Sequence, residues 1–156
     1  MRKIGLTGTI GTGKSEAARV LRKLGAVVIE ADALGHETYR RGAPAYRDLV
    51  EEFGQQIVGE EGEVDRKALG KIVFADPARR QRLEAIVWPR IRQAISDRLT
   101  RAEQAGRSAA VVDAAVLLEA GWDELVDEVW AVEAPDARVI ERLRRRNGWS
   151  EEQVRQ

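Results

Sequence analysis

The chain has 156 residues, 44% of them hydrophobic and 33% charged, and its 26 acidic side chains balance its 26 basic ones. This composition is typical of a soluble globular chain, and the charge balance gives no argument for nucleic acid as a partner. The lack of cysteine excludes disulfides, thiolate metal sites and cysteine nucleophiles. No signal peptide and no stretch of membrane-spanning length is visible, so we expect a cytoplasmic protein that binds neither nucleic acid nor membrane.

The first predicted strand, residues 4–7, leads into Gly8-Thr9-Ile10-Gly11-Thr12-Gly13-Lys14-Ser15, and a helical pattern follows. This octet fits the phosphate-binding pattern G-x-x-x-x-G-K-[S/T], known as Walker A, in its strand–loop–helix context. Glycines let several backbone N–H groups point at one spot, where the helix also aims its positive end. Lys14 would reach the β- and γ-phosphates of a nucleotide, and the Ser15 hydroxyl would hold Mg²⁺. The alternative is a glycine-rich turn that binds nothing.

The helix after this loop ends at Gly25 and is expected to bury four apolar residues at helical spacing, Ala17, Val20, Leu21 and Leu24. Residues 26–29 then form an apolar run, typical of a strand covered on both faces, which delivers Asp32 to its carboxyl end. We expect this strand to lie beside the first one, where α/β sheets place ligands. Asp32 could accept the proton of an attacking hydroxyl, or it could simply cap a helix.

A long helical stretch, roughly residues 35–105, separates this strand from the next one. Pro44 and Pro77 each fit the first position of a helix, and Asp65 can cap another. Pro89 should kink or split the helix that contains it. We therefore predict a helical insertion between two strands of the sheet.

Residues 109–112 are predicted to form a third buried strand, which ends at Asp113, and residues 126–132 a fourth. Pro135 then opens another helix. Strands that alternate with helices predict a parallel α/β sheet with right-handed crossovers. In phosphate-loop proteins the position of Asp113 can contact Mg²⁺, although a cap or turn residue is the alternative.

A phosphate loop alone indicates only a bound nucleotide, but the size of the chain and its helical insertion favour a small-molecule kinase. Arg142 and Arg146 share one face of the last predicted helix. They could close over ATP and stabilise the transferring phosphoryl group, or form a solvated basic face. The only histidine, His36, lies four residues after Asp32, and we interpret it as structural or as a polar neighbour of the site.

The last residues have an unusual pattern. Ser150-Glu151-Glu152-Gln153 is a capping box, which marks a helix start, yet only three residues follow it. A helix that short is not stable alone. We therefore expect the chain to stop inside a structural element.

Taken in order, segments along nearly the whole chain resemble the dephospho-coenzyme A kinase family. The phosphate loop is the most specific of them. The others are individually weak and include Ala31-Asp32, Gly42-Ala43-Pro44-Ala45-Tyr46, Asp65-Arg66-Lys67-Ala68-Leu69-Gly70, Leu117-Leu118-Glu119-Ala120-Gly121 and Glu141-Arg142-Leu143.

The resemblance implies a P-loop kinase fold: a parallel sheet flanked by helices, with a helical insertion and a lid. It implies an ATP-dependent phosphotransferase of coenzyme A biosynthesis, which phosphorylates the ribose 3′-hydroxyl of dephospho-coenzyme A with ATP and Mg²⁺. Residues 1–34 and 106–135 would form the nucleotide-binding core, 35–105 the coenzyme-binding insertion and 136–156 the lid. The family continues beyond Gln156 through a last strand and helix, which we expect to be absent from this chain.

Carried over position by position, the family's site has three parts in this chain. Asp32 would be the base and contact the acceptor, Arg142 would be the lid arginine, and the ATP phosphates would lie on Gly11, Thr12, Gly13, Lys14, Ser15 and Glu16. The implied mechanism is an in-line transfer in which Mg²⁺, Lys14 and Arg142 neutralise charge. Ser15 and Asp113 would hold the Mg²⁺ ion.

Several positions depart from the family pattern. Thr9 replaces the second glycine of the loop, Thr12 replaces its serine, and Glu16 stands where threonine is frequent. Trp88-Pro89 replaces a His-Pro pair, and we place Trp88 on the acceptor side. Two alternatives stay open: another P-loop kinase, for a nucleoside or sugar, and a nucleotide-binding protein without catalysis, which the departures at Thr9, Glu16 and Trp88 suggest.

Overall fold

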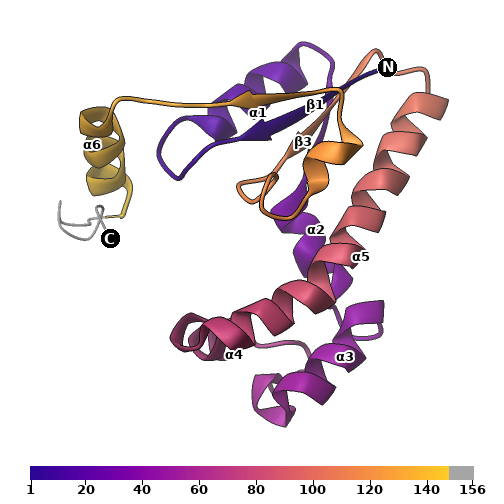
Figure 1. Cartoon of the computed structure of the whole chain (residues 1–156), viewed down its shortest axis with the longest axis vertical. Helices are drawn as coiled ribbons and strands as arrows, with labels where there is room; N and C mark the ends of the chain where they lie inside the picture. The colour runs from indigo at the N-terminus through magenta and orange to yellow at the C-terminus, as the bar shows by residue number, and fades with distance from the viewer. Residues whose placement is uncertain (148–156) are drawn as a thin grey trace. The chain divides into compact units, whose positions relative to one another are not determined.

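The computed structural model describes the backbone of residues 1–147 and the side chains of residues 1–145 (Figure 1). The chain divides into two compact units. We call residues 1–30 together with the chain from Leu99 onward the sheet unit, and Ala31–Arg98 the helical unit.

Within residues 1–147, the sheet unit contains four parallel strands, β1 (Arg2–Thr7), β2 (Val27–Glu30), β3 (Ala109–Asp113) and β4 (Glu128–Ala131). Their order is β2-β3-β1-β4, so the expectation that the second strand lies beside the first is wrong. The burial of β3 explains why it, and not β2, lies beside β1. Residues 110–112 of β3 are fully buried, and a strand that apolar is stable only between two neighbours, whereas the four-residue β2 can take an edge.

The register of β3 places Asp113 level with residues on both neighbouring strands. Asp113 lies opposite Leu6 of β1 and opposite Glu30 of β2. The carboxyl ends of parallel strands meet at one edge of a sheet, so β3 delivers Asp113 to the edge where β1 runs into the phosphate loop.

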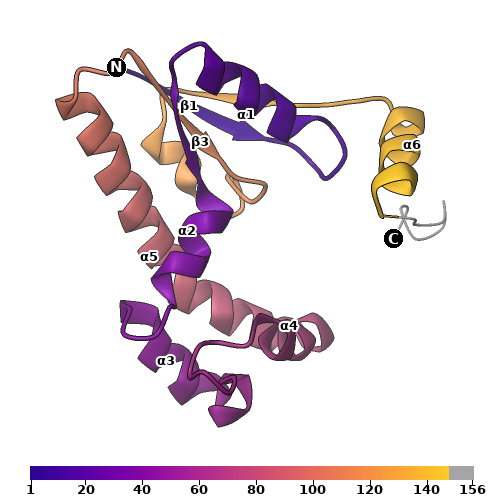
Figure 2. The ribbon, with the colours of Figure 1, turned by 180° about the vertical axis from the view of Figure 1, so that it is seen from behind.

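Helix α1 (Lys14–Lys23) lies alongside β1 and β3 in both ribbon views (Figures 1 and 2). Its buried Ala18 belongs to a core cluster with Ile4, Leu6 and Val111. The predicted burial of Val20 and Leu24 is wrong, since they are 44% and 78% exposed.

The physical reason lies in the face that α1 turns to the sheet. Ala17, Ala18 and Leu21 pack against the core, which turns Val20 to the solvent. Leu24 lies past the last helical residue, where the left-handed backbone of Gly25 (φ 96°) turns the chain back toward β2. Gly25 therefore ends the helix as predicted.

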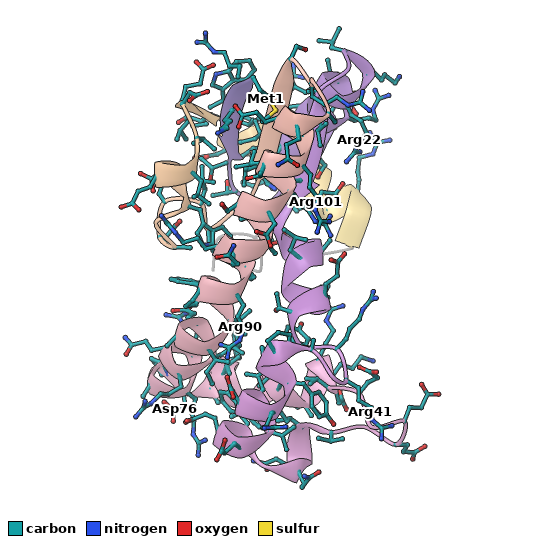
Figure 3. All side chains as sticks on the ribbon, turned by 90° about the vertical axis from the view of Figure 1, so that its right-hand side faces the viewer. Met1, Arg22, Arg41, Asp76, Arg90 and Arg101 are labelled. Carbon is teal, nitrogen blue, oxygen red and sulfur yellow. The ribbon has the colours of Figure 1, made fainter. Side chains whose placement is uncertain are left out.

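The helical unit holds α2 (Ala31–Thr38), α3 (Pro44–Phe53), the 3-10 turn η1 (Gln55–Ile57), α4 (Arg66–Ala75) and most of α5 (Pro77–Gln104). Its core comprises Leu34, Ala45, Leu49, Phe53, Ile57, Leu69, Val87, Ile91 and Ile95. The Asp65 carboxylate accepts hydrogen bonds from the amides of Lys67 and Ala68, which confirms the predicted cap. Arg90 of α5, labelled in Figure 3, forms an ion pair with Asp48 of α3.

Pro89 does not split its helix. Helix α5 runs unbroken from Pro77 to Gln104, although its ribbon changes direction partway along (Figures 1 and 2). The Arg90 guanidinium donates to the carbonyl oxygen of Ile86, within the helical turn that the proline interrupts. A proline lacks the amide that would bond one turn back, so this stretch bends while remaining helical.

Between β3 and β4, the turn η2 (Trp122–Leu125) carries a buried Trp122. After β4, helix α6 (Asp136–Asn147) begins directly behind Pro135, as predicted. The capping box at residues 150–153 lies outside the described residues. None of the helices within residues 1–147 has the length and the apolar content to cross a membrane.

Candidate active site

The phosphate loop occupies residues 8–13, between β1 and α1, and Thr12 holds its shape. Only 8% of Thr12 is exposed. Its hydroxyl donates to the carbonyl oxygen of Thr9 over 2.8 Å, and its amide donates to the same oxygen over 3.3 Å. Gly11 and Gly13 have φ angles of 87° and 106°, a region that side chains disfavour. A threonine at position 12 therefore closes the loop through its own hydroxyl.

The first turn of α1 contributes backbone donors to this loop. Gly13 is the N-cap residue and provides no side chain, and the first full helical turn closes from the Ala17 amide to the Gly13 carbonyl oxygen over 3.0 Å. The amides of Lys14 and Ser15 precede that bond, so they belong to the orphan N–H groups of a helix start. Together with the helix dipole, they make this end of α1 suited to an anion.

Glu16 stays out of the loop. Its exposed carboxylate accepts hydrogen bonds from the Arg19 guanidinium one turn along α1, and this bond lowers the pKa of Glu16. The negative charge is thus compensated on the helix surface. Ser15, beside it, is exposed.

Lys14 and Asp113, which the sequence suggested separately, form an ion pair. Their side chains are only 16% and 11% exposed. Lys14 is the first residue of α1 and Asp113 the last of β3, so the pair joins the phosphate loop to the sheet. The arrangement brings an ammonium and a carboxylate to the same edge.

Arg142 reaches the loop from α6. Its Nη1 donates to the carbonyl oxygens of Gly11 and Thr12, each over 3.1 Å. Two apolar side chains of α6 approach the same glycine: a Cβ atom added to Gly11 would lie 3.0 Å from Val139 and 3.2 Å from Leu143. Leu143 is 5% exposed, so α6 packs directly on the loop. The side chain of Arg146 lies outside the described side chains.

In the helical unit, Asp32 is exposed in the first turn of α2, two residues after β2 ends. His36 follows on the same helix, and its Nδ1 shares a hydrogen bond of 2.7 Å with the Tyr39 hydroxyl. Burial lowers the pKa of His36, and the charge of Arg66 lowers it further against the opposing effect of Asp32. Burial raises the pKa of Tyr39, against the charge of Arg66 and a hydrogen bond with it.

The sequence interpretation missed two members of this group, Tyr39 and Arg66. The signal was present in the spacing, because Asp32, His36 and Tyr39 stand at positions i, i+4 and i+7. Arg66 could not be found this way, since it comes from the start of α4. Trp88 is half-buried on α5.

The described residues, 1–147, gather no three histidine, carboxylate or cysteine side chains that could hold a metal ion alone. Of the two metal ligands expected from the sequence, Ser15 lies in the first turn of α1, and Asp113, at the end of β3, is paired with Lys14.

Comparison with known proteins gives one consistent result. The family model described as dephospho-CoA kinase matches residues 2–156. A dephospho-CoA kinase of Symbiobacterium thermophilum is 47% identical over 154 residues, which cover 99% of this chain and 64% of the relative. One of Geobacter sulfurreducens is 46% identical over 156 residues, which cover 100% of this chain and 79% of the relative.

The fold agrees with this result. The crystal structure of TT1252 from Thermus thermophilus matches with a TM-score of 0.81 and 35% identity, and the match covers 98% of this chain and 76% of that one. A dephospho-CoA kinase from Campylobacter jejuni has the same fold, with a TM-score of 0.68 and 23% identity over 99% of this chain and 78% of that one. The parallel sheet flanked by helices is thus the fold of P-loop kinases, as the motif predicted. The chain belongs to the dephospho-CoA kinase family, a family of ATP-dependent kinases.

Proposed function

We propose that this protein transfers the γ-phosphoryl group of ATP to the 3′-hydroxyl of the ribose of dephospho-CoA, giving CoA and ADP. The observation that carries the proposal is that Arg142 bonds the loop at Gly11 and Thr12 while Lys14, which directly follows the loop, pairs with Asp113, in a chain of this family. In the reaction, the hydroxyl oxygen forms a bond to the γ-phosphorus while the bond from that phosphorus to the β–γ bridging oxygen breaks. The leaving group is ADP, and the hydroxyl proton passes to a base.

The loop would bind ATP mainly through its backbone. We place the phosphates on Gly11, Thr12, Gly13, Lys14, Ser15 and Glu16, which surround a helix start where a negative charge is stabilised. Two of their amides, those of Thr12 and Glu16, also donate to the carbonyl oxygens of Thr9 and Gly13. The charges of Lys14 and Arg142 would stabilise the phosphoryl group as it moves. Arg142 already makes two hydrogen bonds with the loop, which supports its place beside the phosphates.

Magnesium fits the donor set at this loop. Ser15 offers a hydroxyl in the first turn of α1, and Asp113 offers a carboxylate at the end of β3. Hard oxygen donors of this kind, completed by water and phosphate, suit Mg²⁺. The bound ion would neutralise charge on the β- and γ-phosphates. Asp113 would then serve two cations, since it also holds Lys14.

On the acceptor side, Asp32 would take the proton of the 3′-hydroxyl. Its exposed carboxylate at the start of α2 is open to a substrate. We assign the helices of residues 35–105 to binding the acceptor, with Trp88 as one contact, and residues 136–156 to a lid. In this proposal the acceptor is a small molecule, the protein acts in the cytoplasm, and nucleic acid is not a partner.

A coupled assay of ADP release tests the proposal. ATP and Mg²⁺ are offered with dephospho-CoA, with a panel of nucleosides and sugars, and without acceptor. We expect ADP release with dephospho-CoA and a product that carries a new 3′-phosphate. Turnover of a nucleoside or sugar instead would indicate another P-loop kinase. ATP binding without turnover of any acceptor would indicate a protein without catalysis.

A further inference from the structure

We propose that His36 recognises the acceptor ribose by donating a hydrogen bond from Nε2 to the hydroxyl next to the one that is phosphorylated. This makes His36 a specificity-determining residue for an acceptor with two neighbouring hydroxyls. The inference rests on the proposed function, because it concerns the same acceptor and the same base, Asp32. It follows from how three side chains of the helical unit are connected.

The first observation is where the side chains of Asp32, His36 and Tyr39 lie. Asp32 and His36 are four residues apart on α2, so their side chains lie on one face, one turn from each other. Tyr39 follows one turn later, and its ring meets the His36 ring edge-on with centroids 5.8 Å apart. Arg66, at the start of α4, hydrogen-bonds Tyr39.

The second step is the direction of the hydrogen bonds. A guanidinium can only donate, so Arg66 donates to the hydroxyl oxygen of Tyr39. That hydroxyl has one hydrogen, and the His36 Nδ1 lies 2.7 Å away. Tyr39 therefore donates to Nδ1, which must be unprotonated to accept.

The groups around His36 determine whether its imidazole is charged and which ring nitrogen carries the hydrogen. Three groups face His36: Tyr39, Arg66 and Asp32. Burial and the positive charge of Arg66 outweigh the effect of Asp32 and lower the pKa of His36, so the ring is neutral at neutral pH. A neutral imidazole whose Nδ1 accepts carries its hydrogen on Nε2. His36 thus carries an N–H donor at Nε2, on a residue one helical turn from Asp32.

The resulting pair matches the chemistry of a ribose. An ionised carboxylate only accepts hydrogen bonds, and an imidazole N–H only donates. Two neighbouring hydroxyls can meet both: the 3′-hydroxyl donates its proton to Asp32, while the 2′-hydroxyl oxygen accepts from His36. A purely structural bond between His36 and Tyr39 would make no distinction between acceptors with and without a 2′-hydroxyl.

The test compares acceptors and variants in pairs. The wild-type protein and H36A are assayed with dephospho-CoA and with its 2′-deoxy analogue. We expect kcat/KM to fall about 10- to 100-fold when either the His36 side chain or the 2′-hydroxyl is removed, because a donor or acceptor then loses its partner. Removing both should cost little more than removing one.

Three further variants sharpen the test. H36Q retains an N–H donor of similar reach and should recover part of the activity with dephospho-CoA. Y39F removes the group that fixes the tautomer and should lose several-fold with dephospho-CoA but little with the 2′-deoxy analogue. T38A is the matched control, because it removes a different hydrogen bond at the end of α2, from the Thr38 hydroxyl to the Gly35 carbonyl oxygen. Thermal unfolding of each variant checks that it is folded.

The outcomes separate the two proposals. Equal losses by H36A on both acceptors, or no loss on either, would overturn the role of His36 while the proposed function stands. A wild-type protein that turns over neither acceptor would overturn the proposed function, and this assignment with it.

Discussion

Lys14 and Asp113 form an ion pair that connects the first residue of α1 to the last residue of β3. Both side chains are largely buried, at 16% and 11% exposure, so each depends on the other for compensation of its charge. The pair therefore supports the fold of the loop, and this contribution can be separated from the role in phosphoryl transfer that we propose for it.

The separation uses K14M alone and together with D113N. K14M leaves the Asp113 carboxylate without its partner, so we expect a loss of about 1–3 kcal/mol in the free energy of unfolding. The double variant removes both charges and should recover most of that loss without recovering turnover. Urea denaturation and the ADP assay measure the two effects. R19M is the control, since its partner Glu16 is exposed and no measurable change in stability is expected. Equal stability of the single and double variants would contradict the argument.

Arg142 provides the second prediction. R142A should reduce kcat/KM for ATP about 100-fold or more, because it removes a cation from the transferring phosphoryl group. R142K should recover little, since Arg142 bonds both carbonyl oxygens through Nη1 alone and keeps its other N–H groups for phosphate oxygens, whereas an ammonium has no planar set of donors for both tasks. Steady-state kinetics at varied ATP concentration measure kcat/KM for each variant. R144A, an exposed neighbour on α6, is the control and should keep wild-type constants.

The third prediction concerns the hydroxyl of Thr12. T12V removes the bond to the Thr9 carbonyl oxygen from a buried position and should weaken ATP binding about tenfold. T12S retains the hydroxyl and should bind ATP as the wild type does. Calorimetric titration with magnesium nucleotide measures both. Similar affinities for T12V and T12S would show that the hydroxyl does not hold the loop.

Asp32 provides the fourth prediction. D32N keeps the shape of the side chain but cannot accept a proton, so turnover should fall about 10²- to 10⁴-fold while ATP affinity stays unchanged. Rates come from the ADP assay and affinities from calorimetry. D97N makes the same substitution at an exposed aspartate of α5 and serves as the control. Undiminished turnover by D32N would remove Asp32 from the role of base.

The fifth prediction is a pH dependence of stability that arises from His36. Its pKa is lowered in the folded protein, so between its ordinary value, about 6.5, and the folded value the unfolded chain binds the proton and the folded chain does not. Stability should therefore fall as pH drops below about 6.5 and level off below the folded pKa. H36Q should lack this slope. Urea denaturation from pH 7.5 to pH 5 shows it clearly, because the chain has one histidine. Parallel pH profiles for both proteins would contradict the assignment.

Much of the fold follows from local patterns. The apolar runs that became β1, β2, β3 and β4 were each found within about two residues, and the caps at Gly25 and Asp65 occur where predicted. Strand order was not predictable in the same way, because a short apolar run does not specify its neighbours. The decisive fact, that residues 110–112 are buried on both sides, exists only in the folded sheet.

The candidate site was partly accessible from sequence. The octet ending at Ser15 predicted a strand–loop–helix unit that the structure contains. The roles of Asp32, Asp113 and Trp88 remain predictions. The ion pair of Lys14 with Asp113 and the approach of Arg66 to Tyr39 join residues far apart in the chain, and no spacing rule relates them.

Gly11 also determines how closely helix α6 packs against the loop. Because it carries no side chain, Val139 and Leu143 can rest against bare main chain, and this closeness lets one guanidinium span two neighbouring peptide oxygens. A methyl group at that position would lie 3.0 Å from Val139 and 3.2 Å from Leu143, on a backbone whose φ of 87° already disfavours a side chain. The smallest residue of the loop thus allows α6 to pack this closely.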